Sequence, residues 1–332
     1  MGFSHSDLVS RFENGKTCGQ ASNMFIEGDV MYSYGHHFPL VVRTPWGNIL
    51  NADKYSSSTS GHQFHCRNLA TIQVPFSALS AAGLISYGRY SSDSLPEQFK
   101  DVWLLDHDEA RYDLIGYSRY DSLEGKMLRM TVKQWSELSA ETQEQWSEVQ
   151  ERRPEAALLK FGEWHYLSSM DGGNYFISKL PEQVETVKEA FESLKPIEVD
   201  GLTECDYPQG RGVQYTEVLT GQYARQGEWF FTPCHELPIS LAIKGKEMTE
   251  DALIKKLYKT MQHDFVLPKP DSSSHDHIAT RGDVWNEGLY VSGSIRHTEH
   301  RMLRLCKADK PRIFLAFRNR AVNSWSASGN VD

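Results

Sequence analysis

The sequence predicts a two-domain α+β protein made of antiparallel sheets and several helices, in which the C-terminal domain is smaller and β-rich. Its 332 residues exceed the usual size of one domain. Short alternating apolar runs between Gly, Asn and Asp turns indicate antiparallel strands, and no regular βαβ alternation is visible. A turn-rich stretch from Pro196 to Gly212 separates the predicted domains, 1–198 and 199–332.

Composition restricts the location and the partners of the protein. The net charge of −9 argues against a general duplex-binding or membrane-binding surface, because both partners are anionic, although a local basic groove stays open. No run of 18 apolar residues occurs and the N-terminus lacks the features of a secretory signal. The five cysteines are scattered without a C-x-x-C pair, as in a reducing compartment. We therefore expect a cytoplasmic protein without a membrane partner.

The N-terminal half is expected to begin with helices and a meander. A helix within residues 1–22 would bury Leu8 and Phe12, and three or four short strands would follow from residue 23 to residue 53. Ser and Thr residues would then cap the next helix. A small-residue helix over 75–88 and a buried strand over 99–106 (FKDVWLLD) complete this part.

The middle of the chain contains the clearest helical pattern. Trp, Leu and Val residues recur at near-helical spacing over 127–153, with a break expected near Ser139. An Asp-Gly turn between aromatic runs predicts a hairpin over 164–177, and Pro181 would open a helix over 182–194.

The C-terminal domain is expected to contain strands in 222–233 and 312–317, a helix over 252–261 and a hairpin over 282–305. In this hairpin Leu289, Val291 and Ile295 alternate with polar or smaller residues, as in a half-buried strand. Its tip, residues 296–301 (RHTEHR), is basic and rich in histidine.

Four histidines in and before that tip are the predicted metal ligands: His275, His277, His297 and His300. The H-x-H pair on an extended segment would point both imidazoles to one side, and the H-x-x-H pair across a turn could supply the other ligands. Neutral imidazoles bind a divalent metal such as zinc or manganese. A cupin is disfavoured, because Arg281 and Gly282 stand where its glutamate is expected. Functional histidines without a metal, and structural or solvent-exposed histidines, are the alternatives.

A second cluster combines hydroxyls with histidines. Ser58, Thr59 and Ser60 at a helix start could hold a phosphate or a carboxylate, and His62 or His65 could serve as the general acid or base. The same Ser-Thr-Ser run occurs in arginine-type ADP-ribosyltransferases, but the E-x-E pair that they need is missing. Ordinary helix capping is the alternative interpretation.

Other charged residues offer further sites. Arg225 and Arg296 are predicted to contact an anionic substrate. Glu228 would either pair with Arg225 at the rim of a strand or supply a carboxylate for acid–base chemistry. Asp106–Glu109, after an apolar run, resembles the magnesium-binding D-x-D of haloacid-dehalogenase-type phosphatases, but the Thr expected after that motif and the βαβ alternation of that fold are missing, which favours a solvated acidic turn. Tyrosines beside Gly and Arg, as in SYGRYSS, can stack bases.

Several segments resemble motifs of a family of hypothetical proteins from bacterial, plasmid and phage sequences: SYGHHFPL, YSSSTSGHQ, RQGEWFF, YVSGSIRHTEH and SWSASGNVD. The resemblance spans most of the chain. It implies an intracellular accessory protein of a mobile element and carries no catalytic residue.

Two functions follow as hypotheses. The first is a hydrolase or transferase that acts on a phosphate-containing substrate, either a nucleotide or a nucleic acid, with the serine-rich loop and the metal site. The second is a non-catalytic binding or assembly protein of a phage or plasmid, in which an aromatic surface forms an oligomer or partner interface.

Overall fold

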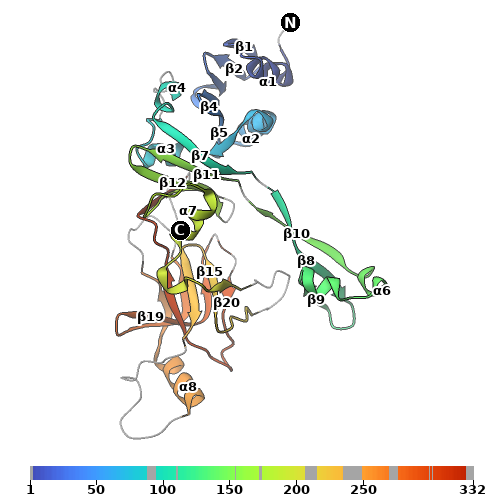
Figure 1. Cartoon of the computed structure of the whole chain (residues 1–332), viewed down its shortest axis with the longest axis vertical. Coiled ribbons are helices and arrows are strands. Elements are labelled where there is room, and N and C mark those ends of the chain that lie inside the picture. The colour runs from blue at the N-terminus through green and yellow to red at the C-terminus, as the bar shows by residue number, and fades with distance from the viewer. Residues whose placement is uncertain are drawn as a thin grey trace. The chain divides into compact units, whose positions relative to one another are not determined.

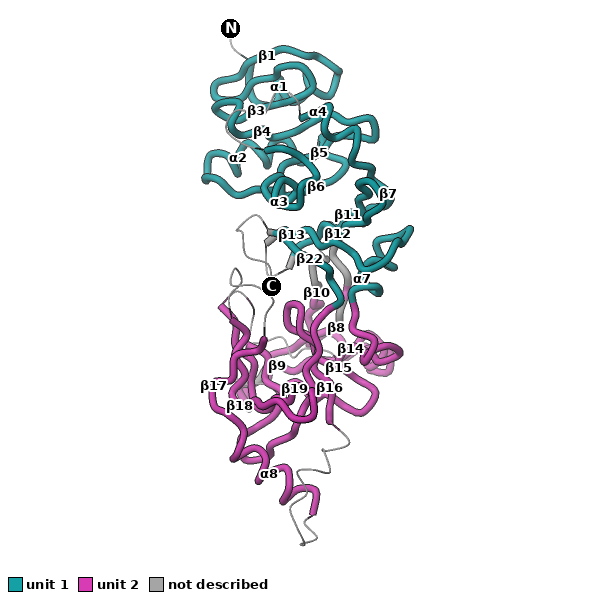
Figure 2. Tube along the Cα trace, turned by 90° about the vertical axis from the view of Figure 1, so that its left-hand side faces the viewer, with its two compact units in different colours: residues 1–111, 154–194, 320–331 teal, residues 112–153, 195–319, 332 magenta. Residues whose placement is uncertain are grey.

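The computed structural model describes residues 3–87, 95–109, 111–153, 155–171, 174–205, 215–234, 249–268, 276–298, 300 and 302–326. The chain forms two compact units from interleaved segments (Figure 2). Unit 1 consists of residues 1–111, 154–194 and 320–331, and unit 2 of residues 112–153, 195–319 and 332. Both units mix helices with mainly antiparallel sheets, which confirms the α+β class. The domain boundary after residue 198 stays a prediction.

The first sheet of unit 1 has six strands in chain order: β1 to β5 form an antiparallel meander, and β6 pairs parallel to β5. Its strands are β1 (Cys18–Ala21), β2 (Met24–Glu27), β3 (Val30–Ser33), β4 (Gly35–Thr44), β5 (Gly47–Asn51) and β6 (Ile72–Val74). The helices beside it in the sequence are α1 (His5–Glu13), α2 (Ser57–Cys66), η1 (Arg67–Leu69), α3 (Phe76–Ala81) and α4 (Leu95–Gln98). Leu8 and Phe12 of α1 are buried, so the predicted first helix and meander are confirmed.

The second sheet of unit 1 has the order β22-β13-β12-β11-β7. Its strands are β7 (Val102–Asp108), β11 (Ala156–Phe161), β12 (Trp164–Asp171), β13 (Asn174–Lys179) and β22 (Asn323–Ser326). β12 and β13 form the predicted hairpin. One apolar cluster joins this sheet to the first, and another lies between it and α7 (Val187–Leu194).

Two expectations for unit 1 are wrong. β7 is not fully buried: it is the edge strand of the described sheet, and Trp103 and Leu105 are 57% and 40% exposed.

Helix α7 begins at Val187, five residues later than the predicted start. There the backbone N–H of Val187 donates to Asp106 Oδ2 at 2.7 Å, while Thr186 Oγ1 accepts from Glu189 N. Capping groups therefore set the start of this helix. Asp106 accepts a hydrogen bond at the helix start and does not belong to a solvated acidic turn.

Unit 2 contains a small sheet of order β10-β8-β9. Its elements are β8 (Arg111–Asp121), β9 (Lys126–Met130), α5 (Val132–Ser136), α6 (Ala140–Gln143) and β10 (Ser147–Arg153). The long helix predicted over 127–153 is therefore wrong. Trp135 stacks on Tyr117 of β8 at 3.7 Å, and the guanidinium of Arg119, also on β8, lies over Trp146. The tryptophans recur because both contact one strand. The Thr131 side chain caps α5, and Ser139 is the N-cap residue of a separate short helix, α6.

The large sheet of unit 2 has the order β14-β15-β16-β21-β19-β18-β17, with β20 paired to β19. Figure 1 labels β15, β19 and β20 of this sheet. Its strands are β14 (Thr203–Glu204), β15 (Gln222–Gln226), β16 (Trp229–Pro233), β17 (Gln262–Val266), β18 (Ile278–Trp285), β19 (Gly288–Arg296), β20 (Leu303–Arg304) and β21 (Phe314–Arg318). The helices of this part are η3 (Ile197–Val199) and α8 (Glu250–Thr260). Phe231, Val291 and Phe314 belong to one buried cluster, as the alternation in the sequence predicts.

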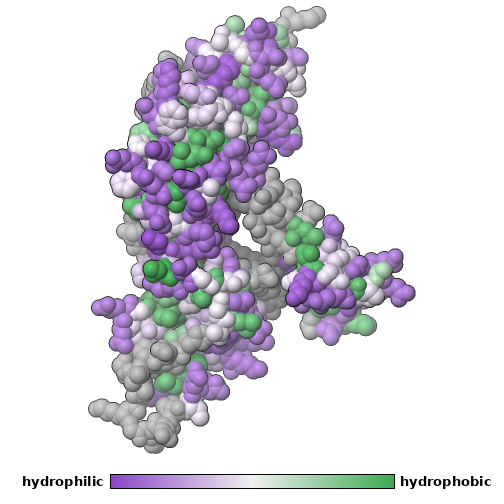
Figure 3. Space-filling view, viewed as in Figure 1, coloured by the Kyte–Doolittle hydropathy of each residue, from purple (hydrophilic) through white to green (hydrophobic). Residues whose placement is uncertain are grey.

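The surface is mostly hydrophilic over the face drawn in Figure 3, with scattered apolar residues. Isolated exposed apolar side chains are normal for a folded domain. No helix in the described part of the chain is long and apolar enough to cross a membrane.

Candidate metal centre

The register of the β18–β19 hairpin brings two of the predicted ligands together. Ile278 pairs with Arg296, so His277, one residue before β18, lies beside His297, one residue after β19. The two imidazoles stack with ring centroids 4.3 Å apart and planes 19° from parallel. At the other end Asn286 and Glu287 both have positive φ, the backbone of a tight primed turn that fixes this register.

His300 completes a group of three imidazoles. Its ring centroid lies 4.7 Å from that of His297 and 5.7 Å from that of His277. One potential ligand atom from each of the three histidines lies within 4.8 Å of the others. β20 returns along β19 through Ile295 and Leu303, so the tip that carries His297 and His300 connects two paired strands. His275 lies outside the described residues, so its role as a ligand stays a prediction.

A turn from another hairpin borders this imidazole triad, by which we mean His277, His297 and His300. Gly227 and Glu228 alone separate β15 from β16. Gly227 has φ +58°, and a Cβ there would lie 2.9 Å from Nε2 of His300 and 3.2 Å from Nε2 of His277. Two Nε2 atoms therefore face one point beside the α-carbon of a glycine, and any side chain would occupy that space.

Glu228 places a carboxylate on the other side of His277. Its Oε1 lies 3.9 Å from Nδ1 of His277, and the two side chains are only 4% and 2% exposed. The rim position expected for Glu228 is therefore wrong. No pattern in the sequence links residues 227–228 to the histidines fifty residues later; the Gly-Glu pair predicts only a turn.

The triad has the composition of a transition-metal site that keeps a position for solvent. Three imidazoles and one open position are the ligand set of catalytic zinc in several enzymes. In a tetrahedral site with bonds of 2.0–2.1 Å, ligand nitrogens are about 3.3 Å apart. Because 4.8 Å is the upper limit of these separations, the ligand atoms must approach by at most about 1.5 Å to reach this spacing. His297 and His300 are only partly buried, whereas the Nε2 atoms of all three histidines are buried from solvent.

The two predicted anion-binding arginines adjoin different parts of the site: Arg225 precedes the bordering turn, and Arg296 precedes His297. Arg225 Nε donates to the backbone O of Gly227 at 2.8 Å, which fixes the bordering turn. Arg296 precedes His297, is largely exposed and pairs with Asp264 of β17. Their contact with a substrate stays a prediction.

The serine-rich loop of unit 1 forms a helix cap. Ser56 Oγ, at the N-cap of α2, accepts from the backbone N of Thr59 at 3.2 Å, and Ser60 Oγ donates to Ser56 O at 3.0 Å. Thr59 is buried, whereas Ser58 and Ser60 are exposed. These contacts are those of ordinary capping. A substrate role for Ser58, Thr59 and Ser60 stays a prediction.

His62 and His65 belong to a second histidine cluster, within unit 1. Nδ1 of buried His62 lies 2.8 Å from Ser33 Oγ, and the ring of His5 lies 5.0 Å from that of His62 and 5.4 Å from that of His65. Burial, then the charges of His5 and His65, lower the pKa of His62 below its ordinary value. His62 therefore stays neutral near pH 7, which a proton acceptor requires.

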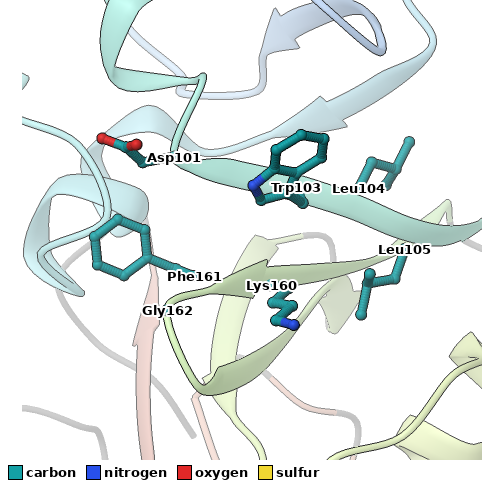
Figure 4. A pocket seen from close by; sticks show the side chains of 7 residues that line it. All are labelled: Asp101, Trp103, Leu104, Leu105, Lys160, Phe161 and Gly162. Carbon is teal, nitrogen blue, oxygen red and sulfur yellow. The ribbon is translucent and has the colours of Figure 1, made fainter.

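A cavity of 610 Å³ in unit 1, not expected from the sequence, has the size of a ligand pocket. Trp103, Leu104 and Leu105 reach it from β7, and Lys160 and Phe161 from β11 (Figure 4). Asp101 and Gly162 complete its lining, which contains no histidine or cysteine. Its chemistry suits contact with a ligand better than acid–base catalysis.

Function is inferred from the geometry of the site, because comparisons with known proteins found no match. Neither a scan of protein-family models nor searches of curated proteins and of solved structures found a match. The resemblance to phage and plasmid sequences stays a prediction.

Proposed function

We propose that this protein is a metal-dependent hydrolase that binds a zinc-class ion through His277, His297 and His300 and acts on a phosphate-containing substrate. The observation that carries this proposal is the convergence of three imidazoles to within 4.8 Å, beside a buried carboxylate. When bound, such an ion acts as a Lewis acid and lowers the pKa of a coordinated water to about 7.

The ligand set favours zinc over manganese. Imidazole nitrogen suits zinc, copper, iron and nickel, whereas carboxylate and water ligands suit magnesium, calcium and manganese. The triad offers nitrogen alone, and Glu228 does not belong to the group of atoms within 4.8 Å. We therefore expect zinc to bind most tightly among the metals normally available to a hydrolase.

The chain's own residues divide the remaining work. The imidazoles hold and orient the ion; parts of the His297 and His300 side chains are exposed, whereas their Nε2 atoms are buried from solvent. We expect Arg225, whose Nε is fixed to Gly227, to hold a phosphate oxygen, because planar guanidinium groups bind phosphate through paired hydrogen bonds. A nucleotide or a nucleic acid would meet this requirement.

Metal analysis is the first test. The protein, purified without a polyhistidine tag or chelator, is examined by inductively coupled plasma mass spectrometry and then titrated with zinc. We expect one equivalent in the wild type and a loss of metal in H277A, H297A and H300A. His263→Ala is the matched control, because His263 is an exposed histidine on β17 of the same unit. A wild-type protein that binds no zinc would refute the proposal.

Activity is tested separately with bis(p-nitrophenyl) phosphate and p-nitrophenyl phosphate. We expect zinc-dependent turnover that H297A lacks and H263A retains. Turnover that is independent of metal, or equal in H297A, would remove the triad from the reaction.

The assembly hypothesis rests on a different observation. Tyr120 and Leu123, in and beside the small sheet of unit 2, are 65% and 97% exposed, and a partner would cover these two apolar side chains in this hypothesis. Size-exclusion chromatography with light scattering tests self-assembly. A dimer that the double substitution Y120S/L123S dissociates would favour this hypothesis, and a monomer would disfavour it.

A further inference from the structure

We infer that Glu228 is a positioning residue for the metal centre, holding His277 in the tautomer and orientation that present Nε2 to the ion. This inference rests on the proposed metal site and goes beyond it, because it assigns a function to a residue that is not a ligand.

The two nitrogens of His277 face different partners. Nε2 faces the point beside Gly227 that Nε2 of His300 also faces, at 3.2 Å and 2.9 Å respectively. Nδ1 faces Oε1 of Glu228 at 3.9 Å. A ligating imidazole must be unprotonated at the bound nitrogen, so its proton resides on the other one. A carboxylate beside that second nitrogen accepts the proton's hydrogen bond and selects the tautomer that ligation requires.

The distance fits a contact that tightens on metal binding. A hydrogen bond between nitrogen and a carboxylate oxygen is about 2.9 Å long, so Nδ1 and Oε1 must approach by about 1 Å. Closure of the triad around an ion requires ring movements of similar size. A rotation of His277 can therefore serve both contacts.

Burial and backbone contacts make Glu228 an effective support. With side-chain exposures of 4% for Glu228 and 2% for His277, bulk water competes little for this contact. The turn is held at both residues: Arg225 Nε donates to Gly227 O, and Asn319 N donates to Glu228 O, each at 2.8 Å. Gln226 Nε2 also lies 3.5 Å from Ile295 O of β19, close to the triad. The backbone that carries the carboxylate is thus fixed by the sheet, which limits the positions open to the side chain.

The test compares Glu228→Gln and Glu228→Asp with wild type in the full chain. Gln keeps the shape and removes the charge, whereas Asp keeps the charge on a shorter side chain. Zinc affinity is measured by competition with a chromophoric chelator, and the visible spectrum of bound Co²⁺ reports ligand geometry. We expect E228Q to lose affinity about 10- to 100-fold, with a changed Co²⁺ spectrum, and E228D to retain most of the affinity.

The controls separate this inference from the proposed function. The control variant Glu217→Gln, which changes an exposed glutamate of unit 2, should bind zinc like wild type.

Circular dichroism with chelator present checks that each metal-free variant is folded; a variant that does not fold is replaced by Glu228→Met. If wild type binds zinc and E228Q binds it equally, with the same Co²⁺ spectrum, the inference is wrong while the proposed function stands. If E228Q and E228D lose affinity equally, with unchanged spectra, Glu228 has a structural role only, which also overturns the inference. Failure of wild type to bind zinc removes the proposed function itself.

Discussion

Gly227 is the position at which one methyl group should abolish metal binding. An alanine there would place its Cβ 2.9 Å from Nε2 of His300 and 3.2 Å from Nε2 of His277. Real Cβ atoms essentially never approach other heavy atoms below 3.0 Å, so the imidazoles must move outward, away from the point that they share. The φ of +58° adds a backbone cost of about 1–2 kcal/mol for an L residue.

Gly221→Ala separates the two effects. Gly221 also lies in unit 2 with a positive φ of +80°, but a Cβ there meets no atom within 4 Å. G221A therefore carries the backbone cost without the steric contact. Both variants should unfold at lower temperature than wild type without metal.

The response to zinc provides the decisive measurement. An ion at 100 times its dissociation constant stabilises the folded state by about 2.7 kcal/mol. For a folding unit of 150–250 residues this raises the melting temperature by about 5–11 °C. Thermal unfolding of each protein is followed with chelator and with zinc. We expect this increase in wild type and in G221A, and none in G227A. An equal increase in G227A would refute the placement of the ion beside Gly227.

Three further predictions concern unit 1. Folding lowers the pKa of His62, so below pH 6.5 the unfolded chain binds more protons than the folded chain. We therefore expect the free energy of unfolding to decrease as the pH falls from 6.5 through the lower pKa that His62 has in the folded protein. Urea unfolding at pH 7.5 and pH 5 measures this, and an H62N variant with the same pH dependence would contradict it. Removing the N-cap in Ser56→Ala should cost about 1 kcal/mol of unfolding free energy, whereas exposed Ser58→Ala should cost almost nothing; equal effects would argue against the cap. Asp106→Ala, which removes the acceptor of the Val187 N–H, should cost about 1–2 kcal/mol in the same assay, and a neutral result would show that α7 does not depend on this bond.

Local patterns predicted local structure well. The Asp-Gly turn between aromatic runs specified the β12–β13 hairpin, and the spacing of Leu8 and Phe12 specified the buried face of α1. These succeed because the interacting residues are neighbours in sequence, so turn chemistry and periodicity suffice. The prediction over 127–153 failed because Trp135 and Trp146 pack on β8, whose pairing is a tertiary contact.

For the candidate site, the sequence by itself determined the ligand types and the hairpin that carries them. The density of histidine at 275–300 identified His277, His297 and His300, and the alternation at 289–295 placed two of them beyond one strand. Only the tertiary structure decided that three imidazoles converge and that Gly227 and Glu228 border them. The physical reason is that the register of β18 with β19 and the approach of the β15–β16 turn depend on packing between segments far apart in the chain, which no short-range pattern encodes.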